Sequence, residues 1–162
     1  MYGNILVPLD GSEVAEGVLP YVQELARRFD SEVTLIQVVA PLSRLVAETV
    51  PAALEPTGTA AAVGIEAASE AARAEREGAR SYLERVAGRL KAQGIKVSAV
   101  IVEGLAGDVL VDYAHRQGID LIAMSTHGRS GLVRMVYGSV ADHVLRHAGT
   151  PVLLIRSRKA KA

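Results

Sequence analysis

Residues 121–139, LIAMSTHGRSGLVRMVYGS, contain the features that decide the fold. The stretch opens with an apolar run, residues 121–124, which is typical of a buried strand. A turn rich in glycine and small residues follows, and Gly138 and Ser139 then open the helical pattern of residues 140–148. Such a loop suits an anion, because its amides and the positive end of the helix dipole face the same point. Phosphate is the expected ligand, although a purely structural connection would also explain a glycine-rich loop.

The composition excludes several classes of protein. The chain has 162 residues, is 49% hydrophobic and carries no net charge, so it can bury one sizeable core and shows no sign of binding nucleic acid. It has no cysteine, which excludes disulfides, thiolate metal sites and cysteine nucleophiles. There is no basic leader and no long apolar segment, so we expect no signal peptide, no membrane span and a cytoplasmic protein.

Short apolar runs alternate with amphipathic patterns along the chain. We expect strands at residues 4–8, 32–39, 96–102, 121–125 and 151–155. We expect helices at residues 12–29, 66–93, 107–117 and 139–147. This alternation predicts one α/β domain, residues 1–156, built on a five-stranded parallel sheet with helices on both faces. Residues 157–162 are then a short basic tail.

Several residues predict where helices begin, bend or end. Ser12 is a plausible N-cap, Pro20 should kink the first helix, and Gly94 is placed to end the second. Residues 41–64 break the alternation, because they mix alanine, proline, threonine and glycine with few larger apolar residues. We expect a long flexible insertion there, a disordered spacer rather than a lid.

Two polar loops point to the position of a binding site. Ligands of open parallel sheets bind beyond the carboxyl ends of the strands. Asp10 follows the first strand and residues 125–131 follow the fourth, so the carboxylate would face the anion loop if these strands are neighbours. A carboxylate beside a phosphate suggests that it holds sugar hydroxyls, as in a nucleotide. Adenine would then lie against apolar strand ends such as Val38 and Met124.

Four stretches of the sequence, taken together, resemble the universal stress protein family. They are ILVPLDGS at 5–12, MSTHGRSGL at 124–132, GSV at 138–140 and TPVLLI at 150–155. The resemblance covers nearly the whole chain, in order and in spacing. It implies a Rossmann-like fold of the adenine nucleotide alpha hydrolase type, with strand order 3-2-1-4-5. It also implies homodimers that pair through the last strand, residues 152–155, and a subgroup that binds ATP through Gly-x2-Gly-x9-Gly-Ser/Thr.

The second half of that ATP motif is present, and the first glycine is not. Gly128, Gly138 and Ser139 match the motif, whereas Ser125 occupies the first glycine position and reaches positive φ less readily than glycine. The choice among ATP, ADP, AMP and no nucleotide, with or without Mg²⁺, therefore stays open. The expected nucleotide-binding residues are Pro8, Asp10, Val38, Met124, Ser125, His127, Gly128, Arg129, Gly131, Gly138, Ser139, Val140 and Ala141.

Some of these residues also have a purely structural interpretation. Asp10 would support the start of the helix capped at Ser12, and Ser139 would form a capping box with Asp142. His143 and His147 have a spacing that metal sites use, but no third ligand is evident, and we expect no metal site.

The sequence predicts binding rather than catalysis. It contains neither a Gly-x4-Gly-Lys-Ser/Thr phosphate loop nor a Gly-x-Ser-x-Gly nucleophile elbow. We therefore expect a dimeric ATP-binding regulatory module of the stress response with an unidentified protein partner. The alternatives are a weak nucleotide hydrolase or transferase that uses the same pocket, and an interaction protein without a nucleotide.

Overall fold

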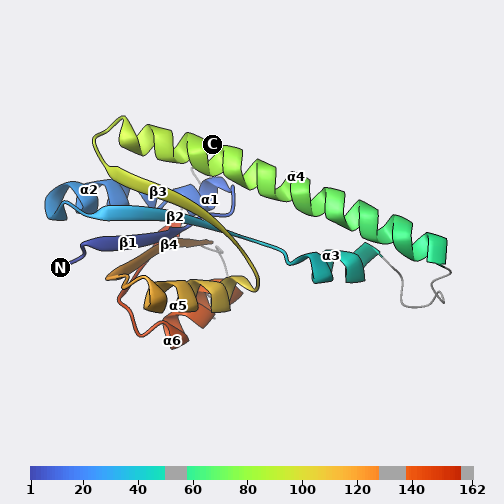
Figure 1. Cartoon of the computed structure of the whole chain (residues 1–162). Coiled ribbons are helices and arrows are strands. Elements are labelled where there is room, and N and C mark those ends of the chain that lie inside the picture. Colours follow the sequence, from blue (N-terminus) through green and yellow to red (C-terminus); the bar gives the residue numbers. More distant parts are fainter. Residues whose placement is uncertain (50–57, 128–137, 158–162) are drawn as a thin grey trace.

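The fold is built on one sheet of five parallel strands. The computed structural model of the chain describes residues 1–49, 58–127 and 138–157. Its strands are β1 (Asn4–Pro8), β2 (Glu32–Val39), β3 (Lys96–Glu103), β4 (Leu121–His127) and β5 (Val152–Ser157). They lie in the order β3-β2-β1-β4-β5, and every neighbouring pair is parallel (Figure 1). The predicted fold class and strand order are confirmed.

Helices cover both faces of the sheet. They are α1 (Glu13–Glu16), α2 (Leu19–Phe29), α3 (Leu42–Thr49), α4 (Gly58–Lys91), α5 (Ala106–Arg116) and α6 (Ser139–His147). Figure 1 shows α1, α2 and α4 on one side of the sheet and α5 and α6 on the other. None of the helices in the described part of the chain combines the length and the hydrophobicity that crossing a bilayer requires.

Each face of the sheet has its own hydrophobic core. Ile5 and Val7 of β1 pack on the face that contacts α2 and α4, whereas Leu6 packs with α5 and α6 on the other. All three side chains are fully buried. Burial on both faces explains why the central strands are continuous apolar runs rather than alternating patterns.

The first predicted helix is two helices in the structure. Ser12 caps α1 as predicted, because its Oγ accepts a hydrogen bond from the backbone N–H of Ala15 at 3.1 Å. Helix α1 ends at Glu16 with Gly17 as its C-cap, and α2 begins at Leu19, with Pro20 in its first turn. The predicted kink inside one helix is wrong. Pro20 lies in the first turn of α2, where a backbone N–H has no intrahelical acceptor, so the missing N–H of proline does not distort the helix.

The described parts of the predicted flexible insertion at residues 41–64 are largely helical. Leu42–Thr49 form α3, and residues 58–64 belong to α4, so the expectation of an irregular segment is wrong for both. The alanines at residues 60–62 favour helix in α4, and α3 packs against α4, where Ala68 is fully buried. Figure 1 shows α4 extending well beyond the sheet, with α3 beside its outer half. Residues 50–57 lie outside the described residues, and the flexibility of the insertion stays a prediction.

Candidate functional site

A cavity lies where the loops after β1 and β4 meet. The two strands are neighbours, with Ile5 opposite Leu121 and Leu6 opposite Ile122, so their carboxyl ends share one edge of the sheet. The cavity has a volume of about 270 Å³. Its lining residues are Pro8, Leu9, Asp10, Ser12, Val14, Ala15, Ile36, Val38, Ala106, Leu110, Met124, Ser125, Thr126, Gly138, Ser139, Val140 and Ala141.

Most of the residues expected from the sequence surround this cavity. Those that line it are Pro8, Asp10, Val38, Met124, Ser125, Gly138, Ser139, Val140 and Ala141. His127 is the last residue of β4. Gly128, Arg129 and Gly131 lie outside the described residues. The cavity thus joins two parts of the chain more than a hundred residues apart, while a role for these residues in binding stays a prediction.

The sequence interpretation missed the walls that α1 and α5 contribute. Val14 and Ala15 of α1 line the cavity, as do Ala106 and Leu110 of α5. Both helices follow the carboxyl ends of strands, α1 after β1 and α5 after β3. The rule that ligands bind beyond the carboxyl ends of parallel strands therefore applies to α1 and α5 as well. The small and apolar side chains of these helices gave no chemical signal in the sequence.

Asp10 supports a turn with one of its two carboxylate oxygens. Its Oδ1 accepts a hydrogen bond from the backbone N–H of Ser12 at 3.0 Å, across Gly11, whose φ is +84°. The Asp10 side chain is exposed, and no residue in the described ranges donates to its Oδ2. The structural interpretation is confirmed, and it is compatible with a second role for the carboxylate.

The start of α6 lines the cavity and contains amides without an intrahelical acceptor. The first intrahelical bond runs from the Asp142 N–H to the Gly138 carbonyl at 2.9 Å, so the N–H groups of residues 139–141 have no acceptor within the helix. Thr126 Oγ1 accepts a hydrogen bond from the Gly138 N–H at 3.5 Å, which connects the end of β4 with this helix start. Unpaired amides at a helix N-terminus are suited to an anion.

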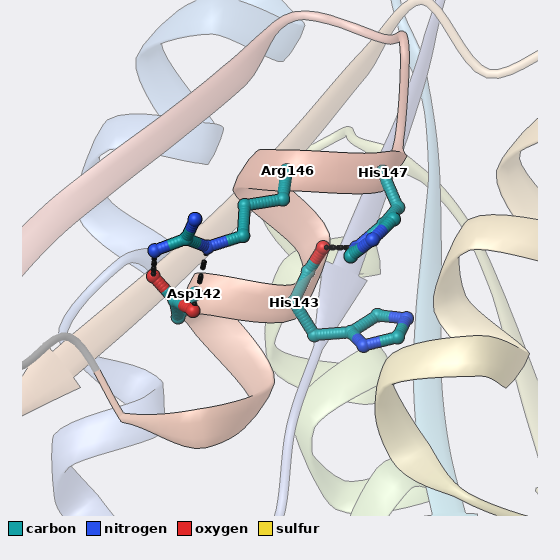
Figure 2. A network of polar contacts seen from close by, with 4 residues as sticks. All are labelled: Asp142, His143, Arg146 and His147. Carbon is teal, nitrogen blue, oxygen red and sulfur yellow. Dashed lines mark hydrogen bonds and ion pairs between the residues drawn. The ribbon is translucent and has the colours of Figure 1, made fainter.

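The predicted capping box at Ser139 is wrong. Gly138 is the N-cap residue, without a side-chain cap, and Ser139 is the first helical residue. Figure 2 shows that Asp142 instead pairs with Arg146 through two hydrogen bonds of 2.8 and 3.2 Å. The hydrogen bond from Arg146 lowers the pKa of Asp142. The carboxylate charge in the first turn is therefore compensated by a cation one turn further on.

Ser125, which stands at the first glycine position of the motif, has an ordinary backbone. It lies within β4 and is paired with Ile155 of β5. The only non-glycine residues with positive φ in the described ranges are Tyr2 and Asp30. The conformation of Ser125 in this structure therefore does not require glycine. Its Oγ is buried and has no hydrogen-bond partner among the described residues.

His143 and His147 lie on α6, and neither lines the cavity. His147 Nδ1 lies 2.8 Å from the carbonyl oxygen of His143 (Figure 2), and the two rings are 4.4 Å apart. His143 Nε2 lies 3.0 Å from Asp108 of α5. The described residues contain no group of three or more His, Asp or Glu side chains arranged to hold a metal ion.

Comparisons with known proteins agree with this fold and its motifs. The universal stress protein family matches residues 1–156. Universal stress protein MJ0531 of Methanocaldococcus jannaschii is 32% identical, over 98% of this chain and 85% of its own length. The solved structure of MJ0577, a universal stress protein of the same organism, has a TM-score of 0.78 at 28% identity and covers 99% of both chains.

A more distant structure shares the fold. A universal stress protein family protein from Arabidopsis thaliana, solved with AMP bound, has a TM-score of 0.61 at 17% identity and covers 96% of this chain and 92% of its own. The match over residues 1–156 and the identity with MJ0531 rest on the whole domain rather than on one motif. This chain belongs to the universal stress protein family.

Proposed function

We propose that this protein binds ATP in the cavity at the carboxyl ends of β1 and β4. The observation that carries the proposal is the convergence of Asp10 and the first turn of α6 on one cavity. The carboxylate repels an anion, whereas the amides at the helix start attract one. A ligand that satisfies both therefore carries hydroxyl groups at one end and phosphate at the other. A nucleotide has this combination.

The phosphates are assigned to the helix start. The N–H groups of Ser139, Val140 and Ala141 are unpaired within α6, and the helix dipole adds positive potential at the same place. Gly128 is the second glycine of the ATP motif, and Arg129 and Gly131 lie in the nine-residue stretch that follows it. We propose that these three residues hold the outer phosphates. Arg129 would supply a guanidinium for this purpose.

The ribose is assigned to Asp10 and the base to the apolar wall. Asp10 Oδ2 accepts no hydrogen bond from the described residues, so it is available for a ribose hydroxyl. Ile36, Val38 and Met124 provide an apolar surface for adenine. The volume of about 270 Å³ is close to the lower end of the range of small-molecule sites, which begins at about 300 Å³. That size suits a base and a sugar, with the phosphates at the start of α6.

The proposal has support from a protein with the same fold. The Arabidopsis thaliana protein was solved with AMP bound, so this fold can hold an adenine nucleotide. For the present chain we propose ATP, because the sequence carries Gly128, Gly138 and Ser139 of the ATP-binding motif.

We further propose a regulatory role in a homodimer rather than catalytic turnover. A nucleotide held by main-chain amides, with no P-loop lysine, is stabilised in its ground state as much as in a transition state, which gives little acceleration. Strand β5 is an edge strand whose residues 152–155 are only half-buried. Pairing of two such edges would remove exposed backbone groups and bury apolar side chains.

Calorimetric titration of the purified protein with ATP, ADP and AMP, each with and without Mg²⁺, tests the proposal. We expect one site per chain and the tightest binding for ATP. Mass spectrometry of an acid extract of the protein checks whether a nucleotide copurifies and already fills the site. If a nucleotide-free preparation binds none of the three nucleotides, the proposal is wrong.

A further inference from the structure

Strand β3 is a long and nearly uncharged edge of the sheet. It pairs with β2 on one side only, and no further backbone hydrogen bond to residues 96–103 occurs in the described part of the chain. Its only charged residues are Lys96 and Glu103 at its two ends, and the stretch between them reads VSAVIV. Exposed edges of natural sheets usually carry a lysine, a proline or a bulge near the centre, because an unprotected edge pairs with other chains. Strand β3 has none of these devices.

A groove runs beside this edge, between β3 and α4. It encloses about 290 Å³ and is lined by Arg76, Arg80, Leu83, Glu84, Ala99 and Ile101. It shares no lining residue with the cavity at the carboxyl ends of β1 and β4. Figure 1 shows α4 running along the sheet next to β3. Ala99 and Ile101 alternate along β3 and form the floor on the α4 side, with Leu83 above them.

The two arginines of the groove differ in their ion pairing. Arg76 is paired with Glu103, the last residue of β3. Arg80, one turn further along α4, is exposed and has no ion pair or hydrogen bond with any residue in the described ranges. A guanidinium in this position, above an apolar floor, can donate two parallel hydrogen bonds to a carboxylate.

We propose that β3 and this groove form a docking site for an extended acidic peptide segment of a partner protein. The segment adds a strand to the sheet through the free backbone groups of β3. Its alternate side chains are small and apolar and lie over Ala99 and Ile101, and an Asp or Glu side chain reaches Arg80. Main-chain bonds supply affinity, and the carboxylate contact supplies specificity.

A second copy of this chain is a poorer occupant. If β3 of two copies paired in an antiparallel way, the two-fold axis that relates the copies would be perpendicular to the shared sheet. Helix α4 of both copies would then lie on the same face of that sheet. Joined through β3 as well as through β5, the chains would form an open-ended array rather than a closed dimer. A peptide strand that brings a carboxylate to Arg80 occupies the edge of one chain without this consequence.

The test is selection of random dodecapeptides displayed on phage against the full-length protein, followed by affinity measurements with the selected synthetic peptides. Arg80→Glu is the test variant and Arg73→Glu the matched control, because Arg73 lies on the same helix, is exposed and does not line the groove. Arg80→Ala removes the guanidinium without adding a negative charge. Circular dichroism melts establish that all variants are folded.

We expect selected peptides with an acidic residue flanked by alternating β-branched or small residues. Their affinity should fall at least about tenfold in Arg80→Glu, less in Arg80→Ala and not at all in Arg73→Glu. Hydrogen exchange of the β3 amides should slow in the complex. Failure to select any peptide, selection of peptides without an acidic residue, unchanged affinity in Arg80→Glu, or protection elsewhere than β3 would each overturn the proposal.

Discussion

Gly107 of α5 packs directly against the imidazole of His143 of α6. A Cβ atom at position 107 would lie 2.7 Å from His143 Cγ and 2.8 Å from its Cδ2. The pair Asp108–His143, at 3.0 Å, holds the ring in this place. The two helices thus meet closely beside Ala106 and Val140, which line the cavity. This contact fixes the distance between two walls of the site.

Replacement of Gly107 by alanine should destabilise the protein. In an exposed helix interior the same change stabilises by about 1 kcal/mol, because alanine has the higher helix propensity. At Gly107 the added methyl group overlaps the imidazole, and overpacking of this kind costs about 1–3 kcal/mol. The sign of the change in the free energy of unfolding, measured with urea, therefore reports the contact.

Two controls separate this overlap from a general effect. Gly88→Ala on α4, where a Cβ meets no atom within 4 Å, should be neutral or stabilising. Gly107→Ala in a His143→Ala background should lose most of its destabilising effect, as a double-mutant cycle. Equal destabilisation with and without the imidazole would show that the contact is not the cause.

Tyr82 contains a polar atom whose removal should leave stability nearly unchanged. Its side chain is 9% exposed, its hydroxyl is buried, and no hydrogen-bond partner for it is present among the described residues. Burial raises the pKa of Tyr82 well above its usual range, followed by the negative charge of the nearby Glu16 carboxylate and a contact with that carboxylate that falls short of hydrogen-bond geometry. Tyr82→Phe should therefore change the free energy of unfolding by less than about 0.5 kcal/mol or increase it. A loss of about 2 kcal/mol or more in chemical denaturation would show that the hydroxyl has a partner.

The pair Asp142–Arg146 predicts a particular response to acid. The hydrogen bond from Arg146 lowers the pKa of Asp142 in the folded state. The stabilisation linked to this shift is present above the ordinary pKa of an aspartate, about 3.9, and is lost as the pH falls through the folded-state value. Arg146→Ala should raise the pKa of Asp142 toward its ordinary value. Carboxyl titration by NMR measures this, and an unchanged Asp142 pKa in the variant would refute the assignment.

Strand β5 should hold two chains together. Leu154→Lys places a charge on this edge strand, and we expect it to convert a dimer into a monomer in sedimentation experiments while the circular dichroism spectrum is retained. Ser98→Lys on the opposite edge, β3, is the matched control and should leave the dimer intact. A wild-type monomer, or a dimer broken only by Ser98→Lys, would exclude pairing through β5.

The sequence was a good guide to the sheet and a poorer one to the helices. Buried parallel strands leave continuous apolar runs, so the strands around Leu6 and Ile122 were recognisable, and the family motifs gave their order. The helix break before Pro20 was missed, because a proline pattern does not distinguish a kink from a new first turn. The helix α3 was missed, because its stability comes from packing against α4, which local composition does not record.

The candidate site was predictable where side chains carry chemistry. Asp10 and Gly138 have distinctive roles in a loop and at a helix start, and both line the cavity. Ala106 and Leu110 line it as well, but alanine and leucine on an amphipathic helix look the same whether they face a core or a cavity. The backbone of Ser125 could not be predicted from its residue type, because its extended conformation is set by pairing with β5.

Calorimetric titration of Gly138→Val with ATP tests the central claim most directly. A Cβ at Gly138 meets no atom of the described residues within 4 Å, and φ −53° with ψ 152° is accessible to any residue, so the variant should fold normally. Gly78→Val, at an equally open position on α4, is the matched control. We predict ATP binding by the wild type and Gly78→Val, and at least about a tenfold loss of affinity in Gly138→Val. Undiminished affinity in Gly138→Val would contradict the assignment of the phosphates to the start of α6.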